Sequence, residues 1–191
     1  EFGRIVVNDK METSVKGVFA IGDVVGGRYA HEAMHGGTVA AENIMKLSTS
    51  MKGQTIPRCI YTIPEIACVG LTEDEAKKTH NVLVGVFHLK ASGRAMTLGS
   101  TDGFVKVIID KKTRKFLGIH IMNERASDMI GEGLLAMKYL NSDDVINSIH
   151  PHPTLVESIK EATLDAYGVA IHSLNKNKKH SPKSLKHYVK N

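Results

Sequence analysis

The chain has 191 residues, of which 42% are hydrophobic and 24% charged, so it is ordinary for a globular protein and long enough to bury a sizeable core. It contains no apolar run near the roughly 20 residues that a membrane-spanning helix needs, which argues against a membrane protein. The net charge of +5 comes from six lysines after residue 173; without them 19 basic residues face 20 acidic ones, so the charge gives no reason to expect a nucleic-acid partner.

The first fifty residues predict two short strands followed by a long helix. Residues 4–8 and 18–21 are β-branched runs around a turn. The second run ends in Gly22-Asp23, the kind of strand-to-loop junction beyond which doubly wound folds bind ligands. Residues 30–47 predict a helix that contains Gly36-Gly37, and close packing against a flat partner is one reason for glycine to persist there.

A polar, turn-prone segment at residues 48–57 predicts a domain boundary, and the chain beyond it predicts an α+β fold. Strands are expected near 59–61 and at 82–89, 104–110 and 115–122, with a hairpin turn at 111–114. Helices are expected at a capping box that starts at Thr72, at 127–139, after Ser142, and at 155–167. The prediction is an antiparallel sheet with helices on one side.

His152 and Glu157 are the candidate catalytic residues. An imidazole titrates near neutrality, with a pKa of about 6.5, and a carboxylate bonded to one ring nitrogen fixes the tautomer and stabilises the imidazolium. The same spacing has a structural alternative, because Thr154 and Glu157 form a Thr-x-x-Glu capping box. Both interpretations remain open from spacing alone.

Residues 31–35 match the His-Glu-x-x-His pattern of zinc metalloproteases, in which His31 and His35 would bind the metal. The pattern fixes three residues in a chain with ten histidines, and no third ligand of the extended motif follows His35. We therefore expect no metal site, and the zinc hydrolase stands as an alternative.

Four segments, in the same order along the chain, resemble motifs of the dihydrolipoamide dehydrogenases within the pyridine nucleotide-disulfide oxidoreductase family. The carboxyl-terminal one is His152-Pro153-Thr154-Leu155 with Glu157, followed by Lys160-Glu161-Ala162 and Tyr167-Gly168. The other three are Gly17-Val18-Phe19-Ala20-Ile21-Gly22-Asp23, the run from Tyr61 to Glu73, and the run from Arg125 to Glu132.

The resemblance implies a domain organisation and a flavin site. Residues 1–50 would be the carboxyl-terminal part of a Rossmann-like FAD-binding domain and 58–172 the interface (dimerisation) domain. Composition, not the resemblance, predicts that 173–191 is a Lys-rich flexible tail or a patch for acidic partners. Gly22 and Asp23 would contact FAD, with the Asp23 carboxylate on ribitol hydroxyls, and the backbone N–H of Ala30 would meet the flavin ring. A plain turn residue is the alternative for Asp23.

For the second site, the resemblance implies a base that deprotonates a dihydrolipoamide thiol. His152 would be that base, Glu157 would hold its imidazole, and the His152-Pro153 bond would be cis. Electrons would pass through a redox disulfide and FAD to NAD+ as co-substrate. The same resemblance implies a homodimer, in which the histidine of one subunit serves the active site of the other. It also implies that lipoyl domains of 2-oxo acid dehydrogenase complexes are partners.

The redox disulfide and the nucleotide motif are not in this sequence. Cys59 and Cys68 lack the Cys-x4-Cys spacing and are interpreted as small core residues in a reducing compartment, whether mitochondrial matrix, another organelle or cytoplasm. We therefore expect the carboxyl-terminal portion of a longer enzyme, inactive alone. The sequence is also compatible with a glutathione- or mercuric-reductase-like enzyme, or with a pure dimerisation module.

Overall fold

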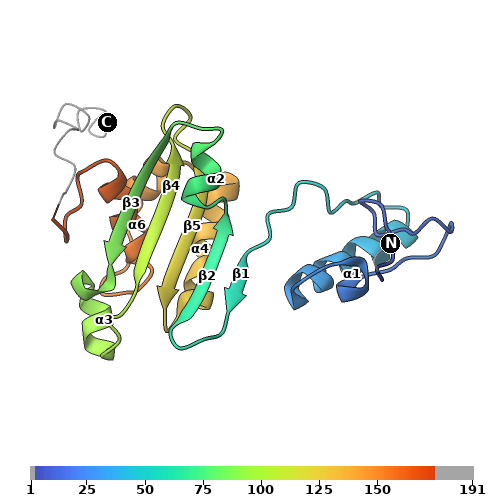
Figure 1. Ribbon diagram of the computed structural model, residues 1–191, viewed down its shortest axis with the longest axis horizontal. Coiled ribbons are helices and arrows are strands. Elements are labelled where there is room, and N and C mark those ends of the chain that lie inside the picture. The colour runs from blue at the N-terminus through green and yellow to red at the C-terminus, as the bar shows by residue number, and fades with distance from the viewer. Residues whose placement is uncertain (1–2, 175–191) are drawn as a thin grey trace. The chain divides into compact units, whose positions relative to one another are not determined.

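The computed structural model describes residues 3–174, which form two compact units, one ending at Ile56 and one beginning at Pro57 (Figure 1). The predicted tail, residues 173–191, lies almost entirely outside the described residues. Within the described part of the chain, the helices are all too short or too polar to cross a membrane.

The first unit is built around α1 (Ala30–Ile44), preceded by a 3-10 turn, η1 (Gly22–Val25). The two predicted strands at 4–8 and 18–21 are wrong: the pairing consists of two isolated bridges, Val7 with Thr13 and Glu12 with Phe19. Among the described residues neither run meets a continuous partner strand, so the hydrogen-bond ladder does not extend.

The two glycines inside α1 permit close packing, as expected. A Cβ on Gly36 would lie 3.3 Å from Sδ of Met11, and one on Gly37 would lie 3.3 Å from Cδ1 of Ile21. The helix ends three residues before the predicted end at Leu47, and Lys46 there has a left-handed φ of 64°. A left-handed residue cannot continue a right-handed helix.

The second unit contains a five-stranded, fully antiparallel sheet of order β1-β2-β5-β4-β3. Its strands are β1 (Arg58–Ile60), β2 (Glu65–Gly70), β3 (Val82–His88), β4 (Phe104–Asp110) and β5 (Phe116–Asn123). The sequence analysis missed β2. That strand is apolar on both faces, so it lacks the alternation that marks a strand with one face in water.

Helices cover one face of this sheet, which confirms the predicted α+β class (Figure 1). Helix α4 (Ala126–Tyr139) packs on β2 and β5, and α6 (Glu157–Ala166) packs on β3 and β4, with α5 (Ser142–Asn147) against α6. The core between the two layers is aliphatic, and its fully buried side chains include Val69, Val105, Val107, Ile119, Ile121 and Ile159. Removing this apolar surface from water is the main force that holds the helices on the sheet.

Helix α6 approaches β3 at a glycine. A Cβ on Gly85 would lie 1.9 Å from the carbonyl oxygen of Ala162, so only glycine permits this separation. One residue later, the backbone N–H of Val86 donates to Oδ2 of Asp165 on α6 at 2.9 Å. These contacts fix the helix whose first residue is Glu157.

Two short helices complete the unit. Helix α2 (Glu73–Lys77) begins at the predicted capping box, in which Thr72 and Glu75 satisfy each other's backbone N–H groups. Helix α3 (Gly93–Leu98), which the sequence analysis missed, is capped by the Ser92 hydroxyl and is preceded by a 3-10 turn, η2 (Leu89–Ala91).

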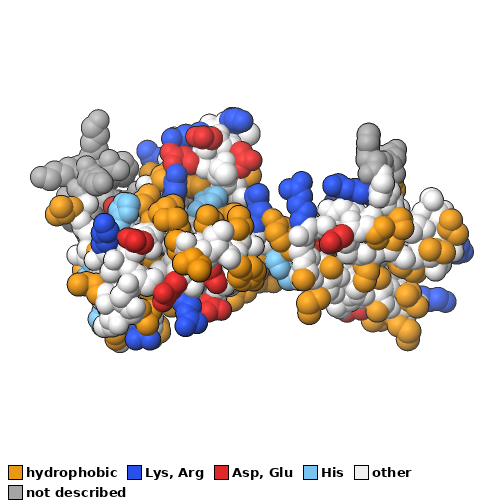
Figure 2. Space-filling view, turned by 60° about the horizontal axis from the view of Figure 1, so that its bottom comes forward, with side chains coloured by type: hydrophobic (Ala, Val, Ile, Leu, Met, Phe, Trp, Pro, Cys, Tyr) orange, Lys and Arg blue, Asp and Glu red, His pale blue; other side chains and the backbone are white. Residues whose placement is uncertain are grey.

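The surface carries both acidic and basic side chains. On the face in Figure 2, acidic and basic side chains alternate with apolar ones over the second unit.

Candidate active site

His152 lies in the loop 148–156, which joins α5 to α6 and has no regular secondary structure. Pro151 and Pro153 flank the histidine and restrict the backbone. The His152–Pro153 peptide bond is cis, as predicted, and so is Ile63–Pro64.

The structure brings the two predicted catalytic residues together. Nδ1 of His152 lies 2.9 Å from Oε2 and 3.2 Å from Oε1 of Glu157. The His152 side chain is 66% exposed, whereas that of Glu157 is 19% exposed. A carboxylate accepts from a protonated Nδ1, so Nε2 is the nitrogen left to exchange a proton with a substrate.

The capping interpretation of the same residues is also realised. The backbone N–H of Thr154 donates to Oε1 of Glu157 at 3.0 Å, and the backbone N–H of Glu157 donates to Oγ1 of Thr154 at 3.4 Å. One carboxylate therefore closes the turn before α6 and holds the imidazole. The two interpretations are not exclusive.

His152 and Glu157 line a small cavity of about 20 Å³ together with a second histidine and glutamate, His172 and Glu161, which sequence reasoning missed. Oε2 of the buried Glu161 accepts the backbone N–H groups of Ile171 and His172, and its Oε1 lies 3.1 Å from Nδ1 of His172. Glu161 follows Glu157 by one helical turn, which places both carboxylates on one face of α6. That spacing is the signal that could have revealed it.

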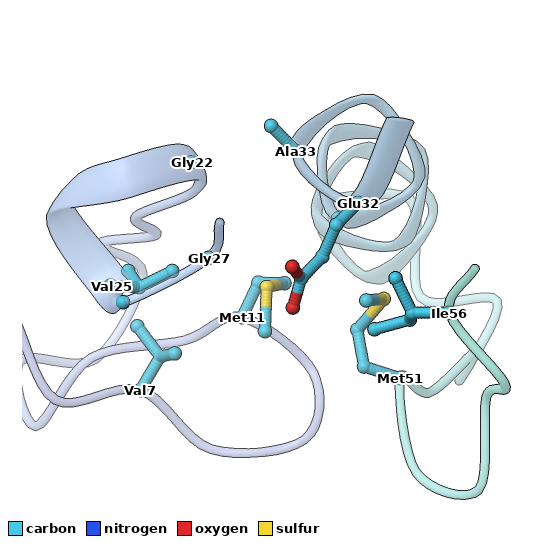
Figure 3. A pocket seen from close by; sticks show the side chains of 11 residues that line it. Val7, Met11, Gly22, Val25, Gly27, Glu32, Ala33, Met51 and Ile56 are labelled. Atoms are coloured by element: carbon cyan, nitrogen blue, oxygen red, sulfur yellow. The ribbon is translucent and has the colours of Figure 1, made fainter. Parts of the chain in front are cut away.

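One of the predicted flavin residues, Gly22, lines a cavity of about 240 Å³ within the first unit (Figure 3). Gly22, with a φ of 80°, lines this cavity together with Gly27 and Ala33, whereas Asp23 and Ala30 are not among its lining residues. A Cβ on Gly27 would lie 3.2 Å from the Gly22 carbonyl oxygen, so the backbone folds closely at the cavity wall. Figure 3 shows the Glu32 carboxylate pointing into the same space.

The alternative zinc site does not assemble. Oε2 of Glu32 accepts the backbone N–H of Arg28 at 3.0 Å, and the His31 ring stacks on Tyr29 with centroids 5.3 Å apart. Across residues 3–174, no three His, Cys, Asp or Glu side chains gather in a way that could bind a metal ion.

The two cysteines are separate thiols. In the β1–β2 pairing Cys59 lies opposite Ala67 and Cys68 lies opposite Arg58, so the two side chains project from opposite faces of the sheet. Burial raises the pKa of the Cys59 thiol, and the nearby Glu65 carboxylate adds to the effect. This pair is therefore not a redox disulfide.

Both units match models of a known protein family. Residues 56–163 match the dimerisation domain of the pyridine nucleotide-disulphide oxidoreductases, and residues 1–47 match a second model of the pyridine nucleotide-disulphide oxidoreductases.

Curated relatives carry the name dihydrolipoyl dehydrogenase. The chain is 47% identical over 177 residues to the Bacillus subtilis protein of that name, covering 90% of this chain and 37% of the relative. It is 41% identical over 175 residues to dihydrolipoyl dehydrogenase 2, mitochondrial, of Arabidopsis thaliana, covering 89% and 34%. The chain thus spans little more than a third of the length of these relatives.

The fold is similar to that of a solved flavoprotein disulfide reductase, the HOCl-induced RclA of Escherichia coli. The TM-score is 0.80 at 23% identity, over 84% of this chain and 38% of that one, so this likeness concerns the fold alone. Because the dimerisation-domain model covers more than half of the 191 residues, the chain belongs to the pyridine nucleotide-disulphide oxidoreductase family.

Proposed function

We propose that this chain is the carboxyl-terminal portion of a flavin-dependent dihydrolipoamide dehydrogenase, which oxidises dihydrolipoamide with NAD+ through a redox disulfide. The observation that carries the proposal is the exposed His152 ring, held at 2.9 Å by the half-buried Glu157 carboxylate. The names of the relatives support the choice of substrate.

In the proposed reaction His152 acts as a general base. Nε2 takes the proton of a dihydrolipoamide thiol, and the resulting thiolate attacks one sulfur of the redox disulfide, forming a mixed disulfide and releasing the other sulfur as a thiolate. Glu157 stabilises the imidazolium formed at His152 and keeps Nε2 directed outward. The cysteines of that disulfide would come from outside this sequence.

The residues of the first unit fit part of a flavin site. The glycine-walled cavity admits close approach of a ligand to the backbone at Gly22 and Gly27. Tyr29 provides no side-chain cap to α1, so the backbone N–H of Ala30 suits an electron-rich flavin carbonyl, and the exposed Asp23 carboxylate suits ribitol hydroxyls. Bound FAD would supply the two-electron acceptor between the disulfide and NAD+.

A homodimer is part of the proposal, with lipoyl domains of 2-oxo acid dehydrogenase complexes as further partners. Large apolar side chains of the second unit are exposed, among them Tyr61 at 77%, Ile63 at 103% and Ile149 at 98%. Such residues favour a protein interface. Light scattering at micromolar concentrations tests the dimer, and a monomer would contradict it.

The decisive experiment uses the full-length enzyme that contains this chain. His152→Gln should slow flavin reduction by dihydrolipoamide in stopped-flow measurements by about 100-fold or more, since a positioned base contributes at least that much. The flavin content should not change. His120→Gln is the matched control, because its ring contacts the Leu71 carbonyl oxygen at 2.9 Å on the sheet. Equal rates in His152→Gln and wild type would refute the base.

A further inference from the structure

The direction in which the His152 ring points depends on the backbone conformation of the loop that carries it. Its side chain is 66% exposed, and among the described residues its polar contact is with Glu157 alone. An exposed ring on an irregular loop has many rotamers and backbone positions to choose from. Other contacts must restrain the loop if the 2.9 Å contact between Nδ1 of His152 and Oε2 of Glu157 is to persist.

His150 is the buried counterpart two residues earlier. Its side chain is 9% exposed, and its Nε2 lies 2.8 Å from Oε1 of Glu132. Glu132 belongs to α4, the helix that packs on β2 and β5. The pair therefore ties the loop to the rigid layer that covers the sheet.

The start of the loop is fastened to the other helix as well. Nζ of Lys160, on α6, donates to the Ser148 carbonyl oxygen at 2.7 Å, and Nδ1 of His150 lies 3.4 Å from the same oxygen. Glu132 and Lys160 are the charged side chains that hydrogen-bond to this part of the loop among residues 3–174, and they come from α4 and α6. The segment that leads into His152 is thus held between α4 and α6, and α6 also carries Glu157.

We propose that His150 is a positioning residue, whose hydrogen bond to Glu132 holds the loop so that His152 stays within reach of Glu157. The inference rests on the proposed role of His152 as a base. A directional hydrogen bond from a buried ring fixes the backbone more precisely than an apolar contact, which has no preferred orientation. Two residues span at most about 7 Å of chain, so any shift at His150 is passed to His152.

The test measures whether the hydrogen bond between His152 and Glu157 is formed, and it does not require enzyme turnover. In the 191-residue chain labelled with 15N-histidine, the Nδ1–H signal of His152 reports its hydrogen bond to Glu157. His150→Ala and Glu132→Ala should each lower the ratio of bonded to unbonded rings by about tenfold, the effect of losing one hydrogen bond to a charged group. His150→Gln keeps an N–H donor for Glu132 and should restore much of the signal.

Two comparisons make the test decisive. His120→Ala removes a distant imidazole and should leave the His152 signal unchanged. Glu132 is 33% exposed, so its replacement should keep the chain folded, and a cooperative thermal unfolding transition checks this. An unchanged His152 signal in both Glu132→Ala and His150→Ala would overturn the inference, whereas the failure of His152 as a base in the full-length enzyme would not affect this readout.

Discussion

Oε1 of Glu157 accepts the backbone N–H of Thr154 at 3.0 Å while Oε2 lies 2.9 Å from Nδ1 of His152. One carboxylate thus closes the turn with Oε1 and makes its shorter contact with the imidazole through Oε2, although Oε1 also lies 3.2 Å from Nδ1. The two tasks can be separated by substitution, because an amide keeps one acceptor and replaces the other by a donor.

Glu157→Gln should preserve stability and lose catalysis. Its carbonyl oxygen can still accept the Thr154 N–H, but its amide N–H would face Nδ1 of His152 and favour the tautomer with a proton on Nε2. That tautomer cannot act as a base, so we expect the thiol half-reaction in the full-length enzyme to slow about 100-fold. Stopped-flow flavin reduction measures this rate.

Glu157→Ala is the matched variant, since it removes both contacts. We expect it to lower the free energy of unfolding by about 1 kcal/mol, the usual worth of a helix-end cap, whereas Glu157→Gln should change it by less than about 0.5 kcal/mol. Urea unfolding distinguishes the two. Equal stability for Gln and Ala, or a wild-type rate in the Gln variant, would contradict the division of tasks.

Gly85 should not tolerate a methyl group. A Cβ there would meet the Ala162 carbonyl oxygen at 1.9 Å and the Ala166 nitrogen at 2.5 Å, so α6 would have to move off β3. Gly85→Ala should cost about 3 kcal/mol of unfolding free energy. The control is Gly131→Ala, where no atom lies within 4 Å, which should stabilise α4 by about 1 kcal/mol. A neutral Gly85→Ala in thermal unfolding would show that the close approach is not required.

The sequence was sufficient to predict those parts of the fold that local chemistry specifies. The capping box at Thr72 and the hairpin between β4 and β5 depend on residues next to each other in the chain, and both are present. Strand β2 lies between β1 and the distant β5, and the runs at 4–8 and 18–21 form only isolated bridges. A single sequence does not reveal which strand a short apolar run pairs with.

The candidate active site was predicted in part for the same reason. His152 and Glu157 lie five residues apart, so their contact could be expected from the sequence. His150 meets Glu132 across 18 residues, and His172 meets Glu161 across 11. Those pairs depend on how α4, α6 and the segment after α6 pack, which no local spacing specifies.

The turn between β4 and β5 should be sensitive to acid. Oδ1 of Asp110 accepts the backbone N–H groups of Thr113 and Lys112 and the Thr113 hydroxyl. The backbone N–H of Thr113 is the main cause that holds the pKa of Asp110 below its ordinary value, and the hydroxyl adds to it.

The ionised carboxylate therefore favours the folded chain. Its contribution is complete above the ordinary Asp pKa of about 3.9 and is lost as the pH falls through the lower value in the folded state. Asp110→Asn should be less stable than wild type at pH 7, and the difference should disappear toward low pH. Denaturant unfolding across this range checks the sign; a difference that grows in acid would contradict it.

Cys59 should react slowly with alkylating reagents. Its raised pKa leaves less thiolate at a given pH than an unfolded cysteine would have. We expect iodoacetamide to label Cys59 more slowly in the native chain than in urea, as followed by mass spectrometry at pH 8. Under mild oxidants no Cys59–Cys68 disulfide should form, since the two side chains project from opposite faces of the sheet; its appearance would show that β1 detaches.

The contact between Asp165 and the backbone N–H of Val86 has a consequence for self-association. Strand β3 is an outer strand of the sheet, and an outer strand normally offers unpaired backbone groups on which another chain can assemble. A carboxylate from α6 occupies one of those donors. A further strand that approached this border of the sheet would therefore find the Val86 donor already paired with a side chain of the same molecule.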